Sequence, residues 1–108
     1  MYLPKLFKDF TENYPGIQEK YKDLSDTCSA AGPLDKKTQE LVKFGVAIGT
    51  NSRGGVMSHT RKAISEGATK EEVMHVILLS LTAVGFTHMM AAMSWVGEIL
   101  EEGTSGGS

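Results

Sequence analysis

The sequence predicts an all-helical fold, and three observations support this prediction. No segment alternates apolar and polar residues with period two for long enough to form a strand. Apolar residues recur instead at intervals of three and four, which gathers them on one face of a helix. Glycines, prolines and helix-capping residues divide the chain into helical segments with short connections. We therefore expect six helices.

The first two predicted helices lie near the N-terminus. Pro4 suits the start of the first helix, and a turn over residues 13–16 ends it. The second helix is expected from Gly16 to Ala31, because Gly32-Pro33 cannot continue it. Its apolar stripe comprises Ile17, Tyr21, Leu24 and Cys28.

The third and fourth predicted helices flank a glycine-rich break. Asp35 is a suitable N-cap for the third helix. The break, rich in Gly, Ser and Asn, covers residues 49–55, and the fourth helix is expected from Gly55 to Glu66. Gly67 suits the position just after that helix. The buried face of the third helix should comprise Leu41, Phe44, Gly45 and Ile48.

The fifth and sixth predicted helices are the most apolar. Thr69 followed by Glu72 is the signature of a capping box at the start of the fifth helix, which Gly85 ends. The sixth helix is expected from Thr87 to Glu101. The fifth helix carries apolar residues on its opposite face as well as on its main stripe: Val73, Val76, Ile77, Leu78, Leu79, Leu81 and Val84. The sixth has the stripe Met89, Met93, Val96 and Leu100, widened by Met90, Ala91 and Trp95.

A helix that is apolar on most sides must be covered on most sides. Four other short helices can hardly enclose both of these, so we expect a homo-oligomer, a trimer or a hexamer, with its interface near residues 73–84 and 87–101. Methionine side chains, six in the chain, suit an interface with irregular gaps. The alternative is that the two helices are the centre of a monomer.

The sequence predicts one domain over residues 1–102. The last residues, 103–108, read GTSGGS, which has the composition of a flexible linker. We expect this tail to form no packed element.

Composition excludes several partners and compartments. Eleven basic and thirteen acidic residues give a net charge of −2, which offers no attraction for nucleic acid or an anionic membrane surface. The apolar runs are shorter than the ~20 residues needed to span a bilayer. The single cysteine, Cys28, has no partner in the chain, and no leader segment is evident, so a reducing, cytoplasmic location is expected.

Glu40 and His59 are the candidate catalytic residues, one on each side of the glycine-rich break. A glutamate and a histidine brought together by a helix–turn–helix can relay a proton. Each also has an ordinary interpretation: His59 as a hydrogen-bonded core residue, and Glu40 as a solvated acid paired with Lys43 or Lys37.

Two polar residues of the break are candidate substrate-binding groups. Ser52 could approach His59 from the loop, and Arg53 could bind a substrate carboxylate, unless it is simply solvated. His75 and His88 stand alone on separate helices, so we predict neither a metal site nor a cofactor.

Glu40, the break, His59 and the pattern A-x-x-x-G-A-T-x-E-E that begins at Ala63 together resemble the carboxymuconolactone decarboxylase family, which includes alkylhydroperoxidase D. The resemblance covers roughly residues 33–95. It implies an all-helical fold that assembles as trimers or hexamers, with Glu40 and His59 in the pocket.

The resemblance also implies which chemistry is missing. In the peroxidase branch a glutamate, a CxxC pair and a histidine form a thiol relay, and the two cysteine positions fall on Ser52 and Gly55 here. Neither residue can cycle through a disulfide, so thiol peroxidase activity is not expected. The decarboxylase branch needs neither cysteines nor cofactor, and His59 assisted by Glu40 could supply its proton.

Two functions therefore stay open. The first is an acid–base pocket for a small organic molecule. The resemblance to decarboxylases suggests that this molecule is a carboxylate and that the protein, if active, is a lyase. The second is a homo-oligomeric assembly subunit, natural or designed, that uses this scaffold without catalysis.

Overall fold

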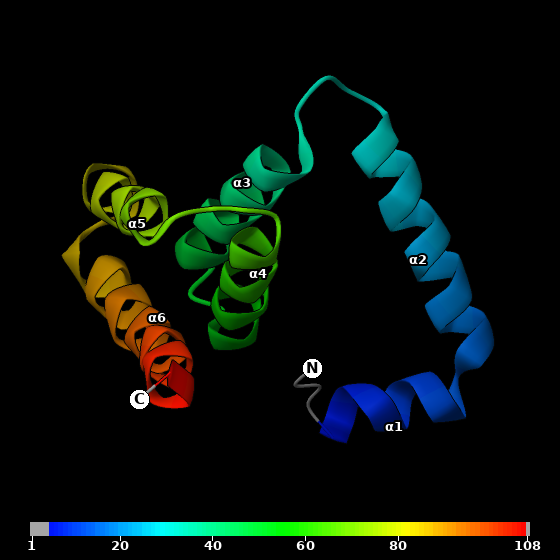
Figure 1. Ribbon diagram of the computed structural model, residues 1–108. Coiled ribbons are helices and arrows are strands. Elements are labelled where there is room, and N and C mark those ends of the chain that lie inside the picture. The colour runs from blue at the N-terminus through cyan, green and yellow to red at the C-terminus, as the bar shows by residue number, and fades with distance from the viewer. Residues whose placement is uncertain (1–4, 108) are drawn as a thin grey trace. The chain divides into compact units, whose positions relative to one another are not determined.

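The protein is all-helical, as predicted. The computed structural model describes the backbone of residues 5–107 and the side chains of residues 5–101, so the expected role of Pro4 lies outside the described residues. No strand occurs in the described backbone. The helices are α1 (Lys5–Asn13), α2 (Pro15–Ala30), α3 (Lys36–Gly49), α4 (Arg53–Ser65), α5 (Lys70–Val84) and α6 (Phe86–Gly107) (Figure 1).

The chain divides into two compact units, one ending at Pro33 and the other beginning at Leu34. In the first unit, α1 and α2 bury no residue of their own. The predicted apolar stripe of α2 is exposed: Ile17, Tyr21 and Leu24 each have more than half of their surface open to solvent. Packing within this unit is local, as between the rings of Phe10 and Tyr14, whose centroids are 5.7 Å apart.

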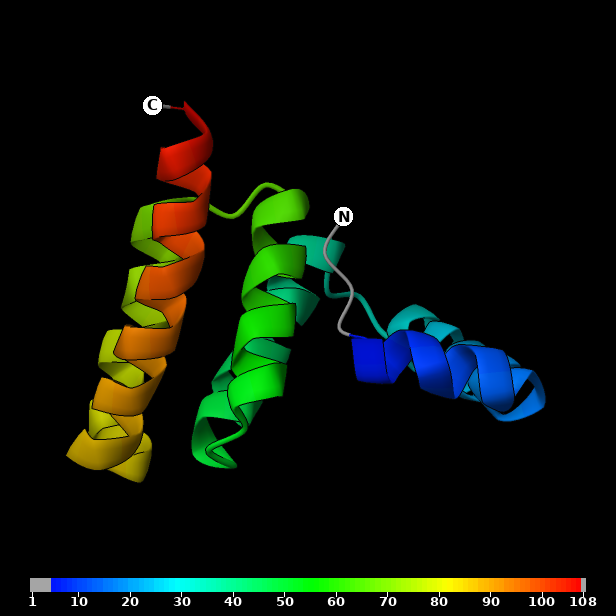
Figure 2. The ribbon, with the colours of Figure 1, turned by 90° about the horizontal axis from the view of Figure 1, so that it is seen from below.

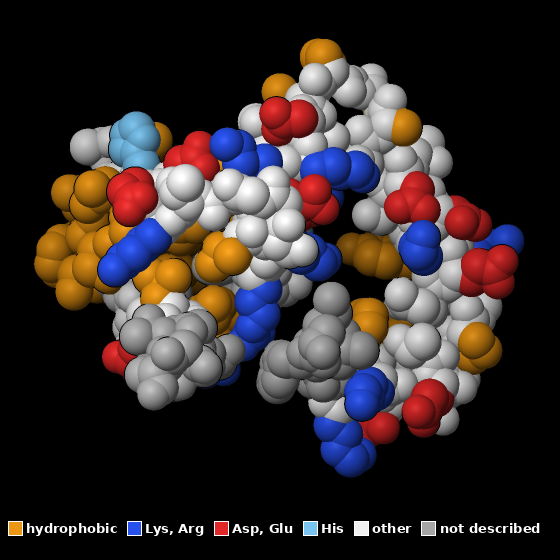
Figure 3. Space-filling model, viewed as in Figure 1, with side chains coloured by type: hydrophobic (Ala, Val, Ile, Leu, Met, Phe, Trp, Pro, Cys, Tyr) orange, Lys and Arg blue, Asp and Glu red, His pale blue; other side chains and the backbone are white. Residues whose placement is uncertain are grey.

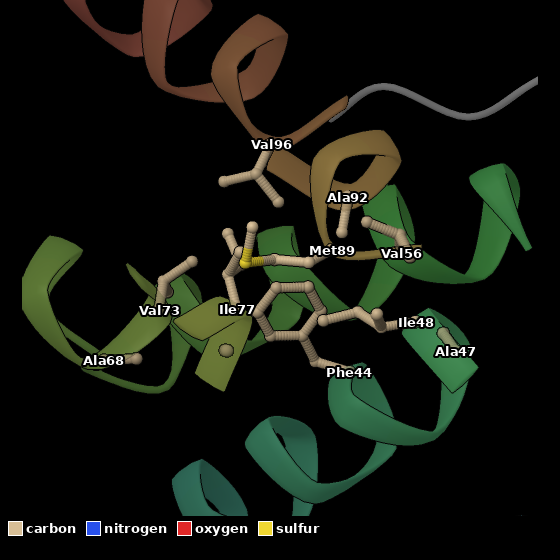
Figure 4. Packing of buried hydrophobic residues seen from close by; sticks show 11 residues of the cluster. Phe44, Ala47, Ile48, Val56, Ala68, Val73, Ile77, Met89, Ala92 and Val96 are labelled. Carbon is tan, nitrogen blue, oxygen red and sulfur yellow. The ribbon is translucent and has the colours of Figure 1, made fainter. Parts of the chain in front are cut away.

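The second unit consists of two helix pairs, α3 with α4 and α5 with α6 (Figure 2). Its core lies where the four helices meet, and Phe44 and Ile77 are at its centre with no exposed surface of their own (Figure 4). The other fully or nearly fully buried apolar residues are Ile48, Val56, Ala63, Val73, Ala92 and Val96. Burial of this apolar surface is the main force that holds the helix pairs together.

The connection between α3 and α4 is shorter than predicted. Helix α4 begins at Arg53, because the Ser52 hydroxyl oxygen accepts a hydrogen bond from the Gly55 amide at 3.0 Å and caps the helix. The sharp turn is made by Asn51, whose φ of 54° lies in the left-handed region that asparagine tolerates. A β-carbon on Gly55 would lie only 3.1 Å from that of Ala47, so this glycine permits close approach of α3 and α4.

The capping box at the start of α5 is confirmed. The Thr69 hydroxyl accepts from the Glu72 amide at 3.0 Å, and the Glu72 carboxylate accepts from the Thr69 amide at 2.9 Å. Gly85, with φ of 103°, ends α5 and lets α6 begin at once. Helix α6 extends through Gly107, beyond the predicted end at Glu101. The flexibility expected of residues 103–108 stays a prediction.

Two capping carboxylates should make the free energy of unfolding depend on pH in the acidic range. The Thr38 amide lowers the pKa of Asp35 below its ordinary 3.8, and the Thr69 amide, then Lys37, lowers the pKa of Glu72 below its ordinary 4.5. A lowered pKa in the folded state gives stability that is fully present above the unfolded-state value. We expect the free energy of unfolding to be level above about pH 5 and to fall as acid protonates these groups.

Urea unfolding between pH 7 and pH 3 measures this dependence. Glu72→Gln should flatten part of the acid limb, because an amide keeps an acceptor oxygen but does not titrate. Glu19→Gln, at an exposed position of α2, is the matched control. Parallel curves for Glu72→Gln and the wild type would rule out the contribution of Glu72.

Candidate functional site

Glu40 and His59 meet where α3 packs on α4. The Glu40 carboxylate oxygen Oε1 and the His59 ring nitrogen Nδ1 are 2.8 Å apart, a hydrogen-bond distance. The two side chains are 14% and 24% exposed, respectively, so the pair sits at the edge of the core rather than inside it. The glycine-rich connection thus brings an acid and an imidazole from neighbouring helices into direct contact.

This contact decides which ring nitrogen is available for chemistry. An ionised carboxylate can only accept hydrogen bonds, so Nδ1 carries the hydrogen that Glu40 accepts. In a neutral imidazole the other nitrogen, Nε2, then holds the free lone pair. The pair is therefore built to take up or deliver a proton at Nε2, while Glu40 balances the charge of the protonated ring.

Lys43 supplies a cation on the other side of Glu40. Its ammonium nitrogen lies 3.9 Å from Glu40 Oε2, while Oε1 faces His59. That distance gives electrostatic attraction without a close hydrogen bond. One of the two lysines considered as partners of Glu40 is thus near it, whereas Lys37 is bonded to Glu72 at 3.0 Å.

Ser52 and Arg53, the two candidate substrate-binding residues, have structural partners. Ser52 is the N-cap of α4. The hydrogen bonds seen among the described residues do not include one between Ser52 and His59. The Arg53 guanidinium binds the Glu98 carboxylate on α6 at 3.0 Å, and both side chains are about half exposed. Binding of a substrate by either residue stays a prediction.

The Arg53–Glu98 ion pair was missed by the sequence analysis. The two residues are 45 positions apart, so no local pattern connects them. By contrast, the spacing of Glu40 and Lys43 by three positions on one helix did point to their proximity.

Cys28 and His75 belong to helices other than α3 and α4. Cys28 is exposed on α2, in the first unit. His75 is exposed on α5, and within the described part of the chain no three side chains of the types His, Cys, Asp and Glu gather as metal ligands would. None of the helices that the structure describes is both long and apolar enough to cross a bilayer.

Comparison with known proteins relates the sequence to a family. Residues 15–98 match the sequence model of the carboxymuconolactone decarboxylase family. An uncharacterized protein of the cox locus of Paracoccus denitrificans is 30% identical over 86 residues, 77% of this chain and 78% of that protein. An uncharacterized protein of Methanocaldococcus jannaschii is 30% identical over 83 residues, 76% of this chain and 80% of that protein.

A solved structure supports the fold independently. The apo form of a carboxymuconolactone decarboxylase family protein from Legionella pneumophila superposes with a TM-score of 0.78 at 23% identity. The similarity covers 89% of this chain and 86% of that one. At this level of identity the likeness establishes the helical fold.

Proposed function

The chain belongs to the carboxymuconolactone decarboxylase family, and we propose that its Glu40–His59 pair performs cofactor-free acid–base chemistry on a small organic carboxylate. The observation that carries the proposal is the 2.8 Å contact, which leaves Nε2 of His59 as the nitrogen that can take up and then deliver a proton. The reaction class is decarboxylation, since it requires one proton donor and no redox group.

The proposed step is loss of carbon dioxide followed by transfer of one proton. The bond between carbon and the substrate carboxylate breaks, carbon dioxide leaves, and the electron pair stays on the substrate as a dienolate. Protonated His59 delivers the Nε2 proton to the carbon that lost the carboxylate. The neutral ring then takes a proton from water. Glu40 stabilises the charged ring before the transfer and holds it in one orientation throughout.

We do not expect the thiol chemistry of the peroxidase branch. The cysteine positions of that branch correspond, by resemblance, to Ser52 and Gly55, and the Ser52 oxygen caps a helix. Cys28 has no second thiol in the chain to form the disulfide of such a cycle.

Release of carbon dioxide from carboxymuconolactone tests the proposed function. The wild-type protein should release it faster than buffer or than an equal concentration of the Glu40→Ala, His59→Ala double variant. A wild-type rate equal to the buffer rate would contradict the proposal for this substrate.

A second candidate function, self-assembly, is supported by exposed apolar side chains. On α5, Leu78 and Leu79 are 55% and 57% exposed, and Phe86 and Met90 at the start of α6 are also open. Figure 3 shows hydrophobic side chains gathered over the α5 side of the second unit. Such a patch is costly in water and typical of an interaction surface. We propose that it is covered by further copies of the chain in a trimer or hexamer.

Light scattering tests the assembly. The particle mass should be three or six times the 11.7 kDa of one chain. Replacing Leu78 and Leu79 together with glutamine should lower that mass, because the interface would lose apolar area. Val42→Gln, at an exposed position of α3, is the control and should leave the mass unchanged. A monomeric wild-type protein would contradict this second proposal.

A further inference from the structure

We infer that Lys43 binds a carboxylate that stays on the substrate, next to the Glu40–His59 pair, an inference that rests on the proposed acid–base function. From the sequence, Arg53 was the candidate for this role. Three observations favour Lys43 instead. It lies beside Glu40, its contact with Glu40 is long, and Arg53 and Lys37 are each bonded to another carboxylate.

The first observation is electrostatic. A carboxylate ligand that approaches His59 also approaches Glu40, whose negative charge is within 2.8 Å of the imidazole. Like charges repel each other, and the repulsion is weakly screened here because Glu40 is only 14% exposed. An anionic substrate therefore needs a cation at this position, and Lys43 Nζ is 3.9 Å from Glu40 Oε2.

The second observation is that Lys43 is not fully committed to Glu40. At 3.9 Å the ammonium is beyond the distance of a strong charge-assisted hydrogen bond, and the side chain is 43% exposed. An ammonium carries three donors on a flexible four-carbon stem. Lys43 can thus keep its attraction to Glu40 and still donate to an incoming carboxylate.

The third observation concerns the competing cations. Arg53 donates to Glu98 at 3.0 Å, so binding a substrate there would first break an ion pair. Lys37 donates to Glu72 at 3.0 Å, and Glu72 belongs to the capping box of α5. Lys43 requires no such rearrangement, and its loose contact is with the catalytic pair itself.

Binding of a charged and an uncharged probe tests this assignment without any reaction. Benzoate is a small carboxylate, and benzamide has nearly the same shape without the charge. By calorimetry, Lys43→Gln should weaken benzoate binding about tenfold or more, while the affinity for benzamide changes less than about twofold. Lys43→Arg should keep most of the benzoate affinity. Lys62→Gln removes the same charge from an exposed position of α4 and should bind like the wild type.

Kinetics with carboxymuconolactone provide the second measurement. Lys43→Gln should raise KM about tenfold and leave kcat within a few-fold, because a carboxylate that stays on the substrate keeps its charge and the lysine binds it alike in the ground and transition states. Benzoate affinities and KM values in Lys43→Gln equal to those of Lys62→Gln would overturn the inference, even if the wild type is an active decarboxylase. A wild-type protein that binds neither benzoate nor carboxymuconolactone would also overturn it.

The two proposals fail in different ways. Lysine-dependent benzoate binding without release of carbon dioxide would contradict the proposed reaction and leave the role of Lys43 standing. Decarboxylation with an unchanged KM in Lys43→Gln would contradict the role of Lys43 and leave the proposed reaction standing. Arg53→Gln, measured in parallel, shows which of the two cations the carboxylate uses.

Discussion

Replacing His59 with alanine is expected to lower kcat for decarboxylation of carboxymuconolactone by about 10²- to 10⁴-fold, the usual contribution of a general acid. Alanine leaves no group in place of Nε2 to deliver a proton to the substrate carbon. Binding should change less, because the proposed carboxylate contact is made by Lys43 and not by the imidazole.

Glu40→Gln refines the same test. Glutamine keeps an oxygen that accepts from Nδ1 but cannot balance the charge of a protonated ring, so kcat should fall by less than in His59→Ala. His75→Ala is the matched control, since that histidine is exposed on α5. Wild-type kcat in His59→Ala would remove His59 from the reaction.

Phe44→Ala is expected to lower the free energy of unfolding by about 3–5 kcal/mol, the range for truncating a buried phenylalanine. Phe44 has no exposed surface and lies at the centre of the core formed by α3 to α6 (Figure 4). The variant loses the transfer free energy of the ring and leaves a cavity that the four helices cannot fully close. Chemical denaturation gives the value directly.

Phe7→Ala in α1 is the control for that loss. Phe7 is exposed and its helix buries no residue, so the change should stay within about 0.5 kcal/mol. Because Phe44 is one turn after Glu40 on α3, its loss should also loosen the Glu40–His59 contact. Equal stability of the Phe44 and Phe7 variants would contradict the described core.

Local chemistry explains which parts of the fold the sequence could predict. Helical periodicity identified the buried residues Phe44, Ile48 and Ile77, and the capping box identified the start of α5. The start of α4 was predicted two residues late, because the N-cap hydroxyl of Ser52 was taken as part of a longer glycine-rich break. The apolar stripe of α2 was recognised, but periodicity alone does not tell what covers it.

The site was predictable to a similar extent. Glu40 and His59 flank a short connection, and two helices joined in this way pack side by side, so their contact could be expected. The engagement of Arg53 by Glu98 could not, because it depends on how α4 packs against α6, far along the chain.

The tautomer of His59 tests the central claim most directly. Long-range proton–nitrogen NMR spectra distinguish a hydrogen on Nδ1 from one on Nε2 in the neutral ring. We predict the Nδ1–H form in the wild type, because Glu40 accepts from that nitrogen, and loss of this preference in Glu40→Ala. A wild-type ring with its hydrogen on Nε2, unchanged in Glu40→Ala, would contradict the pairing on which the proposed chemistry depends.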